Sequence, residues 1–220
     1  MKKLISLLLA VCVAFACIAC GGTKVDTTAT QSDAQQPSST ATNPADSEAF
    51  PTDQPEVSSG GRILVAYFSA TGNTRSVAEI IAQQLNADIY EIVPAQAYTS
   101  DDLNYSSSSS RSTIEQNDDS ARPALADSSL DISQYDIILL GYPIWWGQAP
   151  KIIYTFLESY DFSGKTIAAF CTSSSSGLGS SASNLEPSAP GAFWLEGRRF
   201  ASSASSVSVN EWLSAMGLAD

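Results

Sequence analysis

The chain of 220 residues contains no histidine, and its four cysteines are unevenly placed. The absence of histidine excludes Ser-His-Asp and Cys-His nucleophile systems, together with metal sites built on imidazole. Three of the cysteines lie within the first 20 residues, which leaves only Cys171 for a folded domain. A disulfide within that domain is therefore excluded. Cys171 ends an apolar run, and we expect it to be a buried, unreactive thiol.

Basic side chains are also scarce. Eight Lys and Arg residues follow residue 60, against 17 Asp and Glu residues, so this part carries a net charge of −9. Proteins that bind nucleic acid display basic patches, and this composition argues against a nucleic-acid partner.

Residues 1–20 have the pattern of a bacterial export signal. Two lysines follow the initial Met, and the apolar run that comes next is too short for a comfortable membrane span. Small residues precede Cys20, as in lipoprotein signals, so we expect a signal peptide of the lipoprotein type with lipidation at Cys20. Ordinary cleavage and release is the alternative. The protein is expected to be exported and anchored by its lipid to the outer side of the cytoplasmic membrane or cell envelope.

Residues 21–60 are rich in Ser, Thr, Ala, Gln and Pro and contain too few apolar side chains to bury a core. They predict a disordered tether, which at about 40 residues would span roughly 35 Å. The folded domain is expected over residues 61–220, held near the membrane by the lipid anchor only.

A strand, a hydroxyl-rich turn and a helix open this domain. Ile63–Phe68 is an apolar run that predicts a buried strand, and apolar residues at helical spacing follow from Val77. The turn between them is Ser69-Ala70-Thr71-Gly72-Asn73-Thr74. A helix N-terminus presents free amides and the positive end of the helix dipole, so this turn predicts an anion site. It has no Lys and is not the nucleoside-triphosphate loop. The alternative is a helix whose first amides are capped by the Ser and Thr side chains.

Further strands alternate with helices along the rest of the chain, which predicts a parallel sheet covered on both faces. The segment 101–127 is too long for a bare connection, and we expect a crossover that forms a partial flap. Strands are expected at 87–93, 135–141, 166–171 and 198–200; helices at 112–117, after Pro150 at its first position, at 180–185, and from Ser208-x-x-Glu211 to Gly217.

Ligands of such sheets bind at the carboxyl ends of the strands, where the loops after the first, third and fourth strands meet. The second of these loops contains Trp145 and Trp146, whose large flat side chains suit a flat aromatic ligand. The alternative is that a tryptophan only packs beneath the loop. The third loop, 172–177, offers hydroxyls and amides to a ring edge, or is a flexible polar turn.

Three segments now carry a family resemblance. Ser69–Thr74, Gly141–Gly147 (Gly-Tyr-Pro-Ile-Trp-Trp-Gly) and Phe170–Ser173 resemble the loops of bacterial flavodoxin-like proteins, as does Asp102-Leu103-Asn104-Tyr105. The resemblance runs from about Arg62 to Leu218. It implies an α/β fold, with a flavodoxin-like doubly wound five-stranded parallel sheet in the order 2-1-3-4-5 and helices on both faces.

The resemblance also implies FMN as cofactor and a redox function, either electron transfer or FMN-dependent reduction of a small acceptor. An acidic site would lower the reduction potential of such a cofactor. An FMN-dependent NAD(P)H oxidoreductase is one form that the function would take, while the redox partner and the catalytic residues stay unknown and no metal is expected. The implied FMN contacts are Ser69, Thr71, Gly72, Asn73 and Thr74 for the phosphate, and Pro143, Ile144, Trp145, Trp146, Gly147, Thr172, Ser173, Ser174 and Gly177 for the ring.

One departure keeps an alternative open. Flavodoxin-like proteins usually carry glycines in the third loop, where this chain has Ser174 and Ser175. A non-redox binding lipoprotein that retains the fold without FMN is therefore the second hypothesis for the function.

Overall fold

The computed structural model describes residues 61–219. The predicted export signal, the lipidation at Cys20 and the tether at 21–60 lie outside the described residues and stay predictions. Within residues 61–219 no helix is long and apolar enough to cross a membrane, and no cluster of Cys, Asp and Glu there could hold a metal ion.

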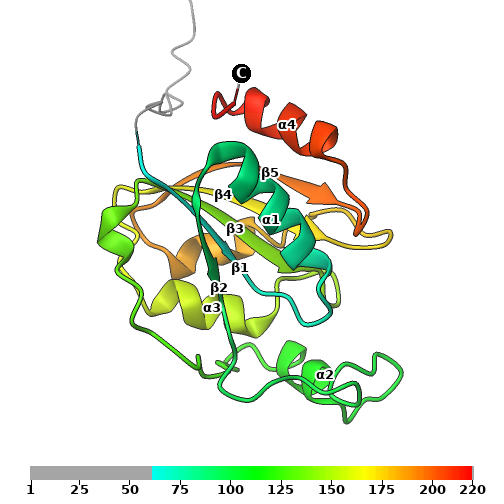
Figure 1. The fold of residues 1–220 in the computed structure, drawn as a ribbon. Helices are drawn as coiled ribbons and strands as arrows, with labels where there is room; N and C mark the ends of the chain where they lie inside the picture. Colours follow the sequence, from blue (N-terminus) through cyan, green and yellow to red (C-terminus); the bar gives the residue numbers. More distant parts are fainter. Residues whose placement is uncertain (1–60, 220) are drawn as a thin grey trace, which may run out of the picture. The chain divides into compact units, whose positions relative to one another are not determined.

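Five parallel strands form one sheet in the order β2-β1-β3-β4-β5, which confirms the predicted fold (Figure 1). The central strands are apolar throughout because both of their faces are covered. The strands are β1 (Ile63–Tyr67), β2 (Asp88–Glu91), β3 (Ile137–Pro143), β4 (Thr166–Thr172) and β5 (Phe193–Phe200).

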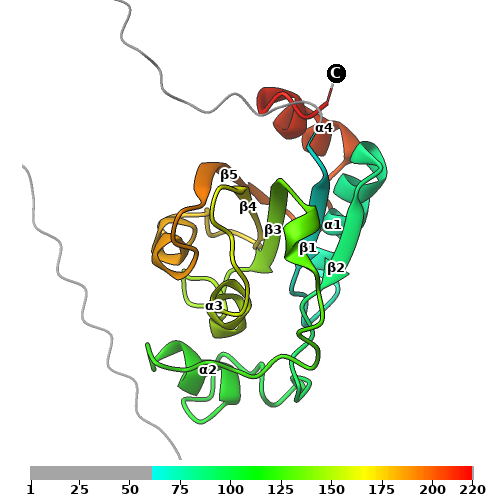
Figure 2. The same ribbon diagram turned by 90° about the vertical axis from the view of Figure 1, so that its left-hand side faces the viewer.

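Helices cover both faces of the sheet. The two views in Figures 1 and 2 show α1 and α4 side by side on one face and α3 on the other, with the segment around α2 beyond α3. The helices are α1 (Asn73–Leu85), α2 (Arg111–Gln116), α3 (Lys151–Glu158) and α4 (Ser206–Ala215), with short 3-10 helices η1 (Ile132–Gln134) and η2 (Ser183–Ser188).

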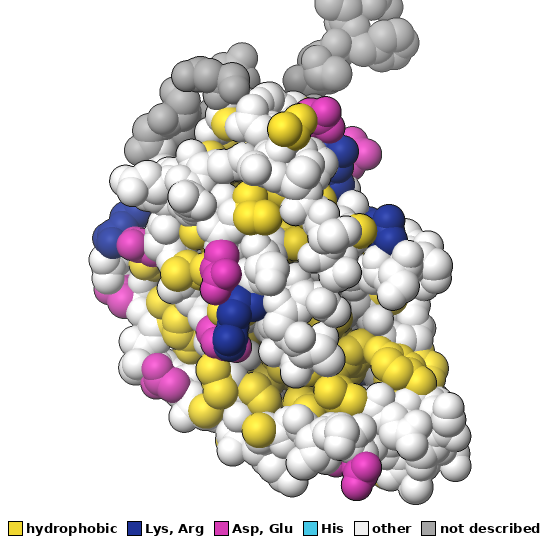
Figure 3. Space-filling view, turned by 45° about the vertical axis from the view of Figure 1, so that its right-hand side comes forward, with side chains coloured by type: hydrophobic (Ala, Val, Ile, Leu, Met, Phe, Trp, Pro, Cys, Tyr) yellow, Lys and Arg dark blue, Asp and Glu magenta, His cyan; other side chains and the backbone are white. Residues whose placement is uncertain are grey.

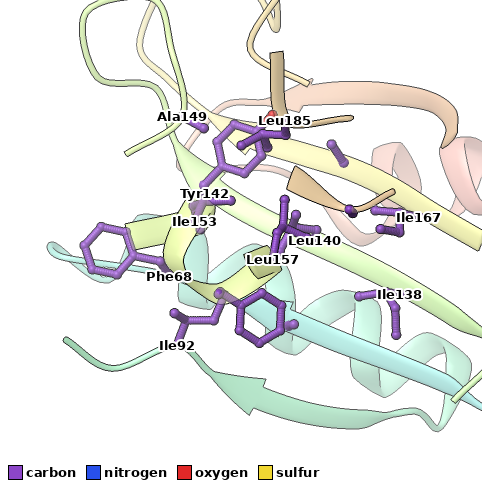
Figure 4. Close-up of a cluster of buried hydrophobic side chains, with 14 of the residues drawn as sticks. Phe68, Ile92, Ile138, Leu140, Tyr142, Ala149, Ile153, Leu157, Ile167 and Leu185 are labelled. Atoms are coloured by element: carbon purple, nitrogen blue, oxygen red, sulfur yellow. The ribbon is translucent and has the colours of Figure 1, made fainter. Parts of the chain in front are cut away.

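The core is divided between the two faces by the alternation of side chains along each strand. On β3, Ile138 and Leu140 point toward α3, while Ile137 and Leu139 pack beneath α1 and α4. Figure 4 shows the first of these clusters, in which Phe68 and Tyr142 lie near the carboxyl ends of β1 and β3. Burial of each such side chain contributes about 1.5–3 kcal/mol, so the loops rest on a rigid platform.

Several predicted boundaries are wrong. The fifth strand is longer than the expected 198–200, and its pairing with β4 is irregular near Gly197, where an added Cβ would lie 2.5 Å from the Ala169 carbonyl oxygen. The expected helix at 180–185 is the later 3-10 helix η2. The last helix is capped by Ser205, whose side chain accepts a hydrogen bond from the Ser208 amide, so Ser208 is not the cap. Pro150 precedes α3 instead of occupying its first position.

Candidate functional site

A cleft of about 500 Å³ lies at the carboxyl ends of the strands. The three predicted loops meet there, joined by residues of the crossover and by Ser202 after β5. Figure 3 brings this side of the molecule forward and shows hydrophobic side chains gathered along the lower part of the visible face. The lining residues are Ala70, Thr71, Asn73, Leu103, Tyr105, Pro143, Ile144, Trp145, Trp146, Gly147, Thr172, Ser173, Ser174, Ser175, Ser176 and Ser202.

None of these lining residues is charged. The expectation of an acidic site is therefore wrong for the cleft wall itself, although the domain carries a net negative charge. Carboxylates elsewhere form ion pairs or accept hydrogen bonds in turns. Glu91, for example, accepts hydrogen bonds from Arg75 at 2.5 and 2.7 Å, and Arg75 also donates to the Tyr67 hydroxyl at 3.2 Å. Arg75 is thereby held on the β1–β2 side and is not among the residues that line the cleft.

The first loop leaves the N-terminus of α1 open. Gly72 stands before the helix with φ of +88°, a left-handed conformation that glycine adopts without strain. No side chain caps the first amides of α1, so the alternative of a helix capped by Ser and Thr is wrong. In the same loop, Ser69 Oγ is buried and has no hydrogen-bond partner among the described residues. Free amides and a buried hydroxyl at the positive end of a helix form an anion-binding arrangement.

Thr74 has a structural role besides the phosphate contact predicted for it, which stays a prediction. Its side chain is buried in the first turn of α1, and its Oγ1 lies 2.8 Å from Thr172 Oγ1 at the end of β4. This bond joins the first loop to the third across the sheet. Thr74 is therefore a link between two walls of the cleft and not part of its surface.

The two tryptophans of the second loop are separated by a tight turn. The Trp145 and Gln148 backbones bond each other at 2.9 Å in both directions, while Trp146 and Gly147 between them have φ of +47° and +76°. Two consecutive positive φ values are typical of a type I′ turn, and a bulky residue there is strained. Trp145 is buried against Phe68 and Tyr98, as the packing alternative predicted, whereas Trp146 is 40% exposed.

The crossover before β3 supplies another wall, which supports the predicted partial flap. Its Tyr105 ring lies 4.4 Å from the Trp146 ring, centroid to centroid, at an angle of 33°. Gln116 at the end of α2 donates hydrogen bonds from Nε2 to the carbonyls of Trp145 (2.8 Å) and Ala149 (3.3 Å). The crossover is thus fastened to both ends of the tryptophan turn.

A polar network holds the crossover in shape. Arg111 Nε donates to Glu115 Oε1 at 2.6 Å, and its guanidinium lies 4.1 Å from the centre of the Tyr98 ring. The Tyr98 hydroxyl donates to Glu115 Oε2 at 2.5 Å. Burial and the Glu115 carboxylate raise the pKa of Tyr98 well above its usual range, so this hydroxyl stays a donor.

Arg199 lies behind the third loop. This residue of β5 donates hydrogen bonds to the carbonyls of Ser173 and Ser174, and Cys171 lies opposite it on β4. Burial raises the pKa of the Cys171 thiol to about 12, so the expected unreactive cysteine is confirmed by its location.

Most of the predicted contacts therefore meet in one cleft. Thr71, Asn73, Pro143–Gly147 and Thr172–Ser174 line it, whereas Ser69, Gly72 and Thr74 stand beside it in the first loop and Gly177 is not among its lining residues. Sequence reasoning missed Ala70, Leu103, Tyr105 and Ser202 as wall residues, and it included Ser175 and Ser176 only as part of the loop 172–177. An isolated aromatic residue next to a run of serines was a signal for Tyr105, and the position of Ser202 after a parallel strand was another.

Comparison with known proteins agrees with this geometry. The model of a protein family described as Flavodoxin matches residues 62–216. Flavodoxin 1 of Escherichia coli (strain K12) is 29% identical over 110 residues, which cover 48% of this chain and 46% of that protein. The chain thus spans about half the length of the curated relatives that it matches.

Two solved structures are similar over nearly their whole length. A candidate flavoprotein of Bacteroides eggerthii DSM 20697 is 43% identical, with a TM-score of 0.68, covering 71% of this chain and 98% of that one. A flavoprotein of Lactobacillus acidophilus NCFM, solved in complex with FMN, is 24% identical, with a TM-score of 0.51, covering 69% of this chain and 98% of that one. The second likeness concerns the fold alone. From its matched family model, its strand order and its cleft at the carboxyl edge of the sheet, this chain belongs to the flavodoxin family.

Proposed function

We propose that this protein binds FMN in the cleft and acts as a redox protein, by electron transfer or by reduction of a small acceptor. The observation that carries the proposal is that the two ends of one cleft differ in chemistry. An uncapped helix N-terminus lies at one end, and an exposed tryptophan held by a strained turn lies at the other.

The first end suits a phosphate group. The amides that open α1 have no side-chain cap, and the buried Ser69 Oγ has no partner within the described residues. Leaving a buried polar atom unpaired costs about 1–3 kcal/mol, which a bound phosphate oxygen would offset. Thr71 and Asn73 line the same end. With no cationic side chain in the wall, this end suits a monophosphate better than a triphosphate.

The second end suits a flat ring. Trp146 and Tyr105 present aromatic faces, and Leu103 and Ile144 add apolar wall. The third loop borders the cleft with hydroxyls and backbone amides. Residues 69–74 would therefore hold the phosphate of FMN, the tryptophan turn would stack against its ring, and residues 172–176 would meet the ring edge.

FMN, when bound, supplies the electron-transfer chemistry, and the protein supplies binding, orientation and electrostatics. Trp146 and Tyr105 orient the ring and exclude water from its faces. Thr74 and Thr172 hold the phosphate and ring loops at a constant separation, 2.8 Å between their hydroxyl oxygens. Ser69 and the α1 amides would stabilise the negative charge of the phosphate through hydrogen bonds and the helix dipole, with no lysine in the cleft wall.

We place this activity outside the cytoplasm. The proposal rests on the export signal at 1–20 and the Cys20 lipidation that the sequence predicts. The lipid would be the only attachment to the membrane, and the redox partner would be a protein or small molecule of the cell envelope.

The test is the visible spectrum of the purified chain before and after incubation with FMN. Retained or acquired flavin absorbance, with a 1:1 stoichiometry, is expected. A protein that stays colourless with excess FMN would overturn the proposal and favour the non-redox binding lipoprotein, for which Ser174 and Ser175 are the only support. Anaerobic addition of NADH and NADPH to the loaded protein would then separate an NAD(P)H oxidoreductase from an electron carrier.

A further inference from the structure

Arg199 makes its contacts behind the third loop of the cleft. Its Nη2 donates to the carbonyl oxygens of Ser173 at 2.6 Å and Ser174 at 2.8 Å, and its Nε to Ser173 Oγ at 3.3 Å. Arg199 is not among the residues that line the cleft, while residues 173–176 are. The guanidinium therefore holds the loop by hydrogen bonds without itself lining the cleft.

This grip determines the direction of two backbone amides. In a trans peptide the N–H points opposite to the C=O of the same unit. Because the carbonyls of Ser173 and Ser174 point toward Arg199, the amides of Ser174 and Ser175 point away from it. No hydrogen bond from either amide is found among residues 61–219. Two adjacent donors, unpaired within the described residues, thus point to the side of the loop opposite Arg199, in a segment (173–176) that lines the cleft.

The positive charge of Arg199 is also not neutralised by a carboxylate. Within residues 61–219 six of the basic side chains form ion pairs with Asp or Glu. Arg199 forms none there and, like Lys165, donates to main-chain carbonyls instead. Arg199 consequently places a net positive charge behind the third loop of an otherwise acidic domain.

We propose that Arg199 is a positioning residue that aims the Ser174 and Ser175 amides at the edge of the flavin ring and favours the reduced cofactor. The inference rests on the proposed function. Reduction adds electron density to the ring, so amide donors and a nearby positive charge stabilise the reduced form more than the oxidised form. In this way the chain would use a charged side chain of β5 and two backbone donors in the loop where the family resemblance leads one to expect glycines.

The experiment compares the full chain with Arg199→Gln, Arg199→Lys and Arg198→Gln. Arg198 precedes Arg199 on β5 but pairs with Glu211 of α4 at 3.5 Å, so it matches the charge change away from the loop. Affinities for oxidised FMN and riboflavin are measured by titration, and the two-electron midpoint potential by spectroelectrochemistry. Unfolding midpoints in urea show whether each variant folds.

Arg199→Gln is expected to weaken FMN and riboflavin binding equally, by about tenfold, because it acts at the ring and not at the phosphate. It should also lower the preference for reduced over oxidised FMN about tenfold, which is about 30 mV in the midpoint potential. Arg199→Lys should keep most of the potential but lose affinity, since Lys keeps the charge without the planar fork. Arg198→Gln should match the wild type in both.

Wild-type affinity and potential in Arg199→Gln would overturn the inference while leaving the proposed function intact. A loss confined to FMN and absent for riboflavin would also overturn it, since the effect would then lie at the phosphate. If Arg199→Gln does not fold, wild-type affinity in Arg199→Lys would also overturn the inference. Failure of the proposed function looks different, because the wild type itself would then bind neither flavin, and the inference would fall with it.

Discussion

The hydroxyl oxygens of Thr74 and Thr172 lie 2.8 Å apart, although the two residues are 98 positions apart in the chain. Both side chains are buried, and no other hydrogen bond is found for either hydroxyl among residues 61–219. The bond connects the start of α1 to the end of β4. It therefore holds together the two loops to which we assign the phosphate and the ring edge.

Thr74→Val should test this link. The substitution keeps the shape but leaves Thr172 Oγ1 buried without a partner, so we expect a loss of about 1–3 kcal/mol in unfolding free energy in urea. The double variant Thr74→Val with Thr172→Val removes both polar groups and should recover most of that loss. Equal destabilisation in the single and double variants would contradict a direct coupling between these hydroxyls.

Ser69→Ala should have opposite effects on the empty protein and on cofactor binding. Because Ser69 Oγ is buried without a partner within the described residues, its removal should leave the unfolding free energy unchanged or raise it by up to about 1 kcal/mol. FMN affinity should fall about tenfold, the value of one hydrogen bond to a charged phosphate. Riboflavin, which has no phosphate, is the control, and its affinity should not change. An equal loss for both ligands would place Ser69 away from the phosphate.

The two adjacent tryptophans should respond differently to replacement by leucine. Trp145 is 4% exposed and packs on Phe68 and Tyr98, so Trp145→Leu should cost about 2–4 kcal/mol of unfolding free energy. Trp146→Leu should change stability little but weaken FMN binding about 3–10-fold through the loss of ring stacking. Urea unfolding and flavin titration of both variants measure the two effects. A loss of FMN affinity in Trp145→Leu and not in Trp146→Leu would show that Trp145 is the stacking residue.

FMN binding should strengthen slightly as salt is added. No cationic side chain lines the cleft, while the residues after 60 carry a net charge of −9, so the long-range field repels the phosphate. We expect a rise of about twofold in affinity between 50 and 500 mM NaCl, a range over which the Debye length falls about threefold. Riboflavin is the uncharged control. A tenfold fall in FMN affinity would instead reveal a cation that contacts the phosphate.

The unfolding free energy should form a plateau between about pH 5.5 and 8.5, because the chain has no histidine to titrate there. Hydrogen bonds from Arg122 hold the pKa of Glu158 below its usual range, and those from Ser133 do the same for Asp131. Stability from such groups is present above their unfolded pKa values and is lost as the pH falls through the folded ones.

At the alkaline limit of the plateau, the unfolding free energy changes with pH in the opposite direction. Burial raises the pKa values of Cys171 and Tyr142, so the folded state keeps protons that the unfolded state releases above about pH 9–10. Stability should therefore fall as the pH rises beyond that range. Urea unfolding from pH 3 to 11 measures both limits of the plateau. A change in unfolding free energy centred near pH 6.5 would contradict the predicted plateau.

The sheet order and the place of the cleft could be predicted because their signals are local. The apolar run of β3, the helical spacing after Gly72 and the polar loops that follow β1, β3 and β4 each carry their own pattern. The length of β5 could not be predicted, since Phe193–Phe200 contains Glu196 and two arginines and lacks an apolar alternation. Its pairing is irregular around Gly197, a contact that depends on Ala169 of the neighbouring strand.

The difference in burial between Trp145 and Trp146 could also not be predicted from the sequence. Both residues have the same chemistry, and only the positive φ of Trp146 turns one ring outward while the other enters the core. The wall formed by Tyr105 depends in the same way on distant contacts, chiefly those of Gln116 with the tryptophan turn. Such contacts join residues about 30 positions apart and leave no periodic signal.

The strained turn at Trp146 gives the protein an optical probe of its own site. Of its four tryptophans, Trp145 and Trp212 are 4% exposed, Trp194 is partly buried and Trp146 is 40% exposed. A soluble quencher such as acrylamide will therefore extinguish the emission of Trp146 before that of the others. Loading and emptying of the cleft can be followed from this intrinsic fluorescence, without a label and without any change to the chain.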